Sequence, residues 1–176
     1  RTPTKNTAGA RHGEGRVTRV MTSASPPGTE NGTTGELALT LAALHACESG
    51  EDPILVVTPA DQTVRDDTAF KVALQQSVRL AAGGGVVILG VTPDRPETGF
   101  GYIQQEGEAG AFGEYRVTKF AEKPSLEVAR SYVEGGQHTW NSGMFVLRAS
   151  TWLKALERFR SDILAATRAA WAVRST

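Results

Sequence analysis

Cysteine, net charge and long apolar runs are all scarce in this chain of 176 residues. Cys47 is its single cysteine, which excludes a disulfide or a cysteine-based metal cluster within the chain and fits a reducing compartment. Lysine and arginine number 19, as do aspartate and glutamate, and no basic stripe runs along the sequence. Apolar runs such as 54–57 and 86–89 fall far short of the roughly 20 residues that a membrane helix needs. We therefore expect neither a nucleic acid nor a membrane as partner.

Histidine is scarce as well, and catalytic groupings built on it are missing. His12, His45 and His138 are widely spaced and form neither a metal-ligand pattern nor a Ser-His-Asp arrangement. Covalent catalysis is therefore not indicated. The chain starts at Arg1 without an apolar signal segment, and we expect cytoplasmic residence, with a homo-oligomer left open.

The chain divides into two unlike parts. Residues 1–35 are rich in Thr, Gly, Ser and Pro, and we interpret them as an irregular leader in which only 17–21 hint at a strand. Residues 36–176 have regular patterns and form the folded domain. Leu37, Leu41 and Leu44 recur at helical spacing and predict a helix packed on the core through these leucines.

A strand, a helix and a second strand follow, which predicts an α/β fold. Residues 53–57 form a continuous apolar run, typical of a strand buried on both faces in a parallel sheet. Asp66 or Asp67 can cap a helix over 67–82, and the run of glycines after it ends that helix. Residues 86–91 form the second buried strand. We expect a Rossmann-like domain with a mostly parallel sheet flanked by helices.

Beyond Pro93 the pattern changes to a β-hairpin insertion. Residues 100–105 and 114–122 are predicted strands around a glycine-rich turn. A short helix over 126–134 follows with Ser125 as its cap, and then a strand over 140–148. Ser150 or Thr151 is expected to cap a helix that ends at Phe159, and 162–171 form another helical stretch.

Asp61 stands just after the first buried strand. Ligands bind at the carboxyl ends of strands in open α/β sheets, so this carboxylate is well placed to hold a magnesium ion that bridges phosphates. An aspartate-capped turn before the next helix explains the same residue without a ligand.

The segment 96–102 combines a carboxylate with glycines. Glu97 can accept hydrogen bonds from sugar hydroxyls, and Gly99 and Gly101 let the backbone approach a ligand closely, with Tyr102 beside them. An ordinary turn that enters a strand is the alternative.

Two further motifs follow predicted strands or lie in them. Glu122 and Lys123 offer an acid and a compact cation suited to a sugar phosphate, although a solvated surface ion pair is the alternative. Asn141 can both donate and accept hydrogen bonds to sugar hydroxyls, and Gly143 keeps the bend narrow. The aromatic residues around Asn141 are otherwise explained as core.

Taken in order, these motifs resemble those of sugar-nucleotide pyrophosphorylases, most closely the bacterial mannose-1-phosphate guanylyltransferases related to bifunctional isomerase enzymes. The resemblance spans about residues 37–171. The matching residues and segments are Thr58-Pro59-Ala60-Asp61, Asp66, Phe70, Pro96-Glu97-Thr98-Gly99-Phe100-Gly101-Tyr102-Ile103, Phe120-Ala121-Glu122-Lys123-Pro124 and Trp140-Asn141-Ser142-Gly143-Met144-Phe145.

The resemblance implies that GTP and mannose 1-phosphate are converted to GDP-mannose and pyrophosphate with Mg²⁺ as cofactor. It implies that Asp61 helps to hold the metal and that Asp61 and Lys123 are catalytic. The implied substrate-binding residues are Glu97, Gly99, Gly101, Tyr102, Glu122, Lys123, Asn141 and Gly143.

The sequence also departs from the family pattern. Residues 1–35 contain no match to the glycine-rich loop that wraps the nucleotide phosphates, and Gln62 stands where a histidine is usual. We therefore interpret the chain as an internal part of such an enzyme, with an incomplete catalytic domain. The alternatives are a non-catalytic sugar-phosphate-binding or regulatory domain, and a pyrophosphorylase for another sugar 1-phosphate.

Overall fold

The computed structural model describes residues 17–23 and 33–174, which form five helices and six strands. The helices are α1 (Thr33–Ala46), α2 (Asp67–Ala82), α3 (Leu126–Gly135), α4 (Ala149–Phe159) and α5 (Ser161–Ala172). The strands are β1 (Val17–Ser23), β2 (Ile54–Val57), β3 (Val86–Val91), β4 (Gly101–Glu106), β5 (Glu114–Glu122) and β6 (His138–Arg148). The α/β class is confirmed. No helix in the described part of the chain is both long and apolar enough to cross a membrane.

The strands form one sheet with the order β2-β6-β3-β1-β5-β4, and the prediction that it is mostly parallel is wrong. Only β1 and β5 pair in parallel, while every other neighbouring pair is antiparallel. The reason is that β6 enters antiparallel between β2 and β3, which run in the same direction. The β4–β5 hairpin is present as predicted.

The sheet curls until its last strand meets β6 again, because β4 pairs with both β5 and β6. Ile88 of β3 and Ile103 of β4 are fully buried at the centre of this curve. Partly buried side chains of β5 and β6 pack around them: Tyr115, Val117, Phe120 and Phe145.

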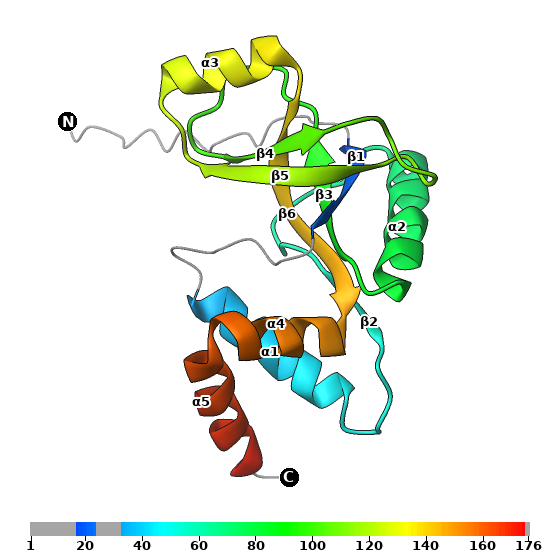
Figure 1. Cartoon of the computed structure of the whole chain (residues 1–176), viewed down its shortest axis with the longest axis vertical. Helices are drawn as coiled ribbons and strands as arrows, with labels where there is room; N and C mark the ends of the chain where they lie inside the picture. The colour runs from blue at the N-terminus through cyan, green and yellow to red at the C-terminus, as the bar shows by residue number, and fades with distance from the viewer. Residues whose placement is uncertain (1–16, 24–32, 175–176) are drawn as a thin grey trace, which may run out of the picture.

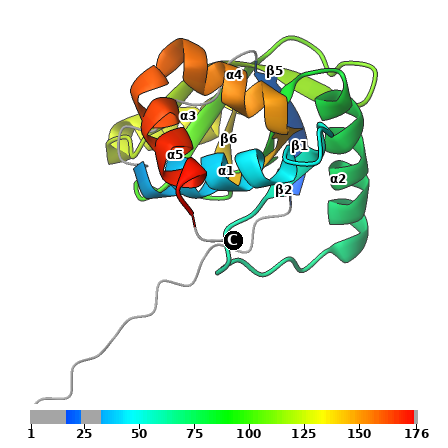
Figure 2. The same cartoon turned by 90° about the horizontal axis from the view of Figure 1, so that it is seen from below.

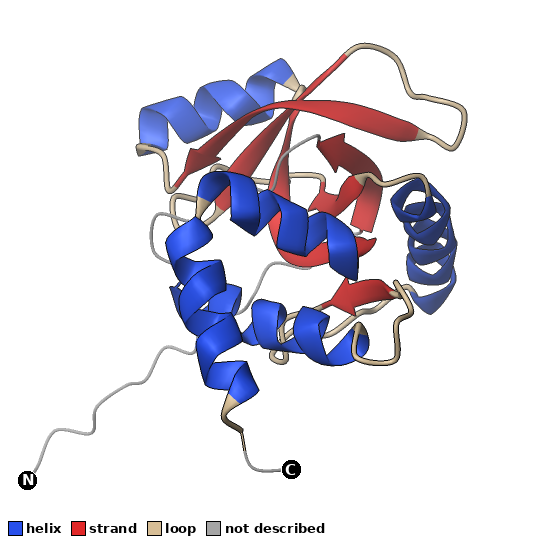
Figure 3. Ribbon diagram, turned by 60° about the horizontal axis from the view of Figure 1, so that its bottom comes forward, coloured by secondary structure: helices blue, strands red, loops and turns tan. Residues whose placement is uncertain are grey.

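The helices lie outside the strands in three groups (Figure 3). Helix α2 stands on one side, α3 lies at the end formed by β4 and β5, and α1, α4 and α5 gather at the other end (Figures 1 and 2). Helix α2 buries Ala73 and Ala81 against Val87, Met144 and other residues of β3 and β6. The helical period of α2 therefore supplies one apolar face that packs on the sheet.

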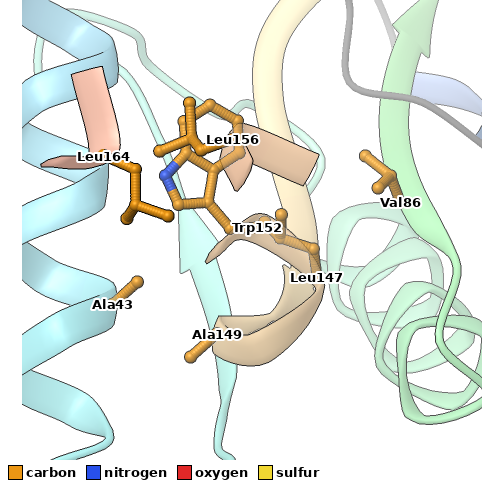
Figure 4. Close-up of a cluster of buried hydrophobic side chains, with 7 residues drawn as sticks. All are labelled: Ala43, Val86, Leu147, Ala149, Trp152, Leu156 and Leu164. Atoms are coloured by element: carbon orange, nitrogen blue, oxygen red, sulfur yellow. The ribbon is translucent and has the colours of Figure 1, made fainter. Parts of the chain in front are cut away.

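The group of α1, α4 and α5 has its own core around Trp152 (Figure 4). The labelled side chains of this core are Ala43, Val86, Leu147, Ala149, Trp152, Leu156 and Leu164. The indole N–H of Trp152 donates to the Thr40 hydroxyl at 3.0 Å, and that hydroxyl donates to the carbonyl of Glu36. Both polar side chains are thus satisfied in an apolar layer.

The inward face of α1 differs from the predicted one. Thr40 and Ala43 are buried, whereas Leu37 and Leu41 are 37% and 38% exposed. The Trp152 indole packs on the small Ala43 and binds the hydroxyl of Thr40. The inward face of α1 is therefore rotated by about one residue from the face that the leucine spacing predicted. A helix that is apolar over much of its surface leaves its inward face undetermined by periodicity.

The predictions for two short apolar segments, 53–57 and 17–21, had opposite outcomes. Strand β2 is an edge strand, and Val56 is 46% exposed, so burial on both faces is wrong. Strand β1 lies between β3 and β5, which confirms the strand expected over 17–21 within the predicted irregular leader. The remaining leader before residue 33 lies outside the described residues.

Local capping signals were accurate for two helices and wrong for a third. Asp66 accepts a hydrogen bond from the backbone N–H of Ala69, and Ser125 accepts one from Val128, as predicted. Helix α4 has no side-chain cap from Ser150 or Thr151. Instead Asp52, distant in sequence, accepts the backbone N–H of Ser150 at 2.9 Å and its hydroxyl at 2.8 Å.

Replacing Asp52 with alanine is expected to lower the free energy of unfolding by roughly 1 kcal/mol or less, since a partly exposed cap is lost. The hydrogen bonds from Ser150 hold the pKa of Asp52 below its usual range. Its contribution is therefore present above the pKa of the unfolded state and disappears as the pH falls through the lower native pKa. Urea unfolding of Asp52→Ala and wild type from pH 7 down to pH 3 measures this, with Glu51→Ala as control. A difference that does not shrink in acid would contradict it.

Candidate functional site

A cavity of about 980 Å³ opens where several strands end. Its walls come from the β2–α2 loop, the start of α2, the last residue of β3, the start of β4, the end of β5 and the middle of β6. Loops placed at strand ends by a rigid sheet are a common position for ligand sites. The predicted location beyond the carboxyl end of β2 is therefore also where the structure has its cavity.

Six of the predicted site residues line this cavity. They are Asp61, Gly99, Gly101, Glu122, Asn141 and Gly143. They come from four segments that are far apart in the sequence, and the sheet brings them together. The separate sequence motifs could not establish that these residues lie together around one cavity.

Asn141 and Gly143 line the cavity at a bulge in β6. The register with β3 passes from Gly90 opposite Asn141 to Ile88 opposite Phe145, so three residues of β6 face one residue of β3. The buried Ser142 hydroxyl donates to the carbonyl of Leu89 at 2.5 Å and accepts the backbone N–H of Met144 at 3.1 Å. A serine side chain thus replaces the ladder bond that the bulge removes.

Two further contacts define the shape of the bulge. The Asn141 side-chain oxygen accepts the backbone N–H of Gly143 at 2.9 Å, which turns this amide side chain back toward its own strand. Gly143 has a φ of 72°, in the left-handed region that favours glycine. A Cβ atom at this position would lie 3.2 Å from Cγ of Pro59, so the bulge and the β2–α2 loop are in close contact.

Gly101 makes room for the carboxylate of Glu122. These residues are register partners in the β4–β5 hairpin. A Cβ atom on Gly101 would lie 2.7 Å from Oε2 of Glu122 and 3.6 Å from Cβ of Asn141. The glycine therefore allows Glu122 to lie across the strand and onto the cavity wall.

Three predicted site residues do not line the cavity. The Tyr102 side chain is fully buried, and its hydroxyl accepts the backbone N–H of Glu97 at 2.9 Å. Its side chain is therefore not among the residues that line the cavity, and its hydroxyl holds the turn that contains Glu97. Glu97 accepts the backbone N–H of Gly99 at 3.2 Å and lies 3.6 Å from Arg95.

Lys123 lies just outside the cavity, next to Glu122, and is exposed. Its φ of 45° makes it the one non-glycine residue with positive φ among the residues that the structure describes. Its backbone N–H donates to the carbonyl of Phe100 at 3.2 Å. A residue before proline normally adopts extended backbone, so this conformation carries strain that the surrounding turns maintain.

Ser142 of β6 lines the cavity without a predicted ligand role, and the same holds for four polar residues of the segment that follows Asp61. They are Gln62, Thr63, Arg65 and, as a lining residue rather than a cap, Asp66. The signal that pointed to Asp61 applies to them equally, because they occupy the same loop at the end of a strand. Gln62 donates from Nε2 to the carbonyl of Ser142 at 2.7 Å.

The cavity wall carries more negative than positive charge. Asp61, Asp66 and Glu122 supply carboxylates, and Arg65 is the cation among the described lining residues. No group of three or more His, Cys, Asp or Glu side chains that could hold a metal ion occurs among residues of the described part. Magnesium is commonly held by one or two carboxylates together with phosphate oxygens, so these donors fit it only in company with a phosphate ligand.

The fold and the cavity define an α/β domain with a polar-lined cavity at the ends of its strands, the usual place for a ligand site in such domains. The chain belongs to the nucleotidyl transferase family, whose model matches residues 6–175. Members of this family generally use a divalent metal ion. The family match confirms the resemblance found in the sequence, whereas the division of the chain at residue 35 stays a prediction.

Several known proteins are similar to this chain. The xanthan biosynthesis protein XanB of Xanthomonas campestris is 42% identical over 134 residues, which cover 76% of this chain and 28% of that protein. A mannose-1-phosphate guanylyltransferase of Klebsiella pneumoniae is 43% identical over 136 residues, 76% of this chain and 29% of that protein. The chain thus spans under a third of the length of these relatives.

A solved structure from Thermus thermophilus, described as mannose-1-phosphate geranyltransferase, has the same fold. It matches with a TM-score of 0.71 and 36% identity, over 80% of this chain and 41% of that chain. At this identity the likeness extends to sequence as well as fold.

We expect Gly143→Ala to lower the free energy of unfolding by about 1–2 kcal/mol, because alanine is strained at positive φ and its methyl group crowds Pro59. Thermal and urea unfolding would measure this change. Gly99→Ala is the matched control, since a Cβ there makes an ordinary contact at 3.5 Å and is expected to change stability by about 0.5 kcal/mol or less. Equal effects of the two substitutions would argue against a strained bulge.

Proposed function

We propose that this chain forms the sugar-phosphate-binding part of a guanylyltransferase that joins mannose 1-phosphate to the guanylyl group of GTP. The observation that carries the proposal is the convergence of Asp61, Glu122 and Asn141 on one cavity. The name of the Klebsiella pneumoniae relative at 43% identity, mannose-1-phosphate guanylyltransferase, supports the choice of sugar and reaction. Substrates, product and activity of the whole protein all belong to this proposal.

In the proposed reaction a phosphate oxygen of mannose 1-phosphate attacks the α-phosphorus of GTP. The new O–P bond forms as the bond between the α-phosphorus and its bridging oxygen breaks, and pyrophosphate leaves with that electron pair. The nucleophile is already an anion, so no protein base has to remove a proton. Positioning and charge neutralisation are then the main tasks of the protein.

The residues of the cavity suit those tasks in different ways. Glu122 and the Asn141 amide can hydrogen-bond sugar hydroxyls, and Gly99 and Gly101 leave room for a ring close to the backbone. Lys123 is exposed and directly follows the lining residue Glu122, which supports a role for its ammonium group in binding a phosphate without being buried. Glu97 holds the turn that carries Gly99 and acts by positioning it.

The cavity wall has more carboxylates than cations, so a metal ion is needed to offset the negative charge of the wall and of a bound phosphate. Asp61 would hold it on the wall, with phosphate oxygens of the ligand as further donors. A magnesium ion bound there would neutralise phosphate charge as the transfer proceeds. We propose Mg²⁺ as this ion.

Calorimetric titration of the 176-residue chain with mannose 1-phosphate, with and without Mg²⁺, tests the proposal. We expect saturable binding that strengthens with Mg²⁺ and is weaker for glucose 1-phosphate. Lys123→Ala is expected to weaken binding about tenfold, since it removes a charge-assisted hydrogen bond to the phosphate.

Lys119→Ala is the matched control, because Lys119 is an exposed lysine of β5, the strand that ends just before Lys123, and does not line the cavity. A folded sample without saturable binding would overturn the proposal. Binding of glucose 1-phosphate as tight as that of mannose 1-phosphate would assign the site to another sugar. Binding of the sugar phosphate without turnover of GTP would favour a non-catalytic binding domain.

A further inference from the structure

The β2–α2 loop carries much of the cavity wall but has little regular structure of its own. Residues 58–66 contain no helix or strand, and the loop is held at its ends by β2 and by the Asp66 cap of α2. Asp61 lies in the middle of this span. Its position relative to the other side of the cavity must therefore come from contacts that the loop makes across the site.

Gln62 makes such a contact, with the backbone carbonyl of a residue that has no register partner in the sheet. Its Nε2 donates to the carbonyl of Ser142 at 2.7 Å, across 80 positions of sequence. Ser142 lies inside the β6 bulge and has no register partner in β2, β3 or β4. The glutamine amide therefore supplies a hydrogen bond that the sheet does not give to this carbonyl.

This bond joins the two sides of the cavity at their functional residues. Gln62 directly follows Asp61, and Ser142 directly follows Asn141, so a single hydrogen bond relates the loop carboxylate to the strand amide. The close approach of Pro59 to Gly143 is a second contact between the same segments, but it is apolar and non-directional. A shift of the loop along β6 is opposed mainly by the directional bond.

We propose that Gln62 is a positioning residue, which holds the Asp61 loop against the β6 bulge and so sets the spacing between Asp61 and Asn141. The link itself is a property of the unliganded protein. Its effect on ligand affinity rests on the proposed binding of a sugar phosphate.

Two substitutions separate the effect of the Gln62 hydrogen bond from the effect of the size of its side chain. Gln62→Leu keeps a side chain of similar size but cannot donate. Gln62→Glu keeps the shape and can donate to the Ser142 carbonyl only while its carboxyl group is protonated. Gln75→Leu is the matched control, because it makes the same change at an exposed position of α2.

The first measurement is amide hydrogen exchange of Gly143 and Met144 in the absence of ligand. Both N–H groups bond within the bulge, to the Asn141 side chain and to the Ser142 hydroxyl. Gln62→Leu is expected to speed their exchange about fivefold relative to wild type, and Gln75→Leu to leave it unchanged. An unchanged rate in folded Gln62→Leu overturns the proposal.

The pH profile of Gln62→Glu gives a signature that a purely structural disturbance lacks. The ratio of its exchange rate to that of wild type is expected to be close to one in acid and to rise to fivefold or more as the carboxyl ionises, with a midpoint at or above about pH 4.3. A flat ratio overturns the proposal.

Affinity for mannose 1-phosphate is the second measurement. Gln62→Leu is expected to raise the Kd for mannose 1-phosphate about fivefold, whereas Gln75→Leu is expected to have the Kd of wild type. If wild type binds no mannose 1-phosphate while the exchange effects appear, the proposed function fails and the positioning role stands. If wild type binds and Gln62→Leu binds equally well, the positioning role fails and the proposed function stands.

Discussion

The structure depends on β6, because this strand pairs with three others along its length. Its first residues pair with β4, its middle with β3, and its last four with β2. A strand with neighbours on both edges cannot shift its register without disturbing every pairing at once. The bulge is the place where β6 leaves this constraint for three residues, and the cavity lies there. The strand that holds the sheet together thus also carries part of the cavity wall.

The glycine and serine residues of the bulge show how a functional irregularity is made stable. Ser142 satisfies the carbonyl of Leu89 with its hydroxyl, so the missing ladder bond does not leave a buried polar group unpaired. Gly143 takes the backbone angle that other residues adopt only at a cost. The result is an irregular segment of β6 that lines the cavity while the side chains of Asn141 and Ser142 are hydrogen-bonded within the sheet.

Sequence patterns predicted the elements well wherever the determining signal is local. The bounds of α2 and β5 follow from Asp66, the glycine run and Pro124, all adjacent to the element concerned. The direction of the sheet could not be predicted in this way, because the antiparallel entry of β6 between β2 and β3 depends on residues some 50 to 90 positions apart.

The site shows the same division. Asp61, Glu122 and Asn141 were recognisable as chemical groups near strand ends, and the sheet does bring them to one cavity. Tyr102 belongs to the same motif as Gly101, but strand alternation turns its side chain into the core, where it meets Tyr132. Gln62 matters through its tertiary partner, which no local pattern reveals.

Support for the cavity is distributed unevenly over its walls. Arg148, the last residue of β6, donates to the carbonyl of Ala82 and to that of Asp52, and so fixes the far end of α2 and the chain before β2. The near end of α2 is fixed by Asp66. Between these held elements, the middle of the β2–α2 loop contains no helix or strand, so regular backbone hydrogen bonds do not hold it. A side-chain hydrogen bond has its largest effect on geometry where such backbone bonds are missing, and the Gln62 amide acts at that point.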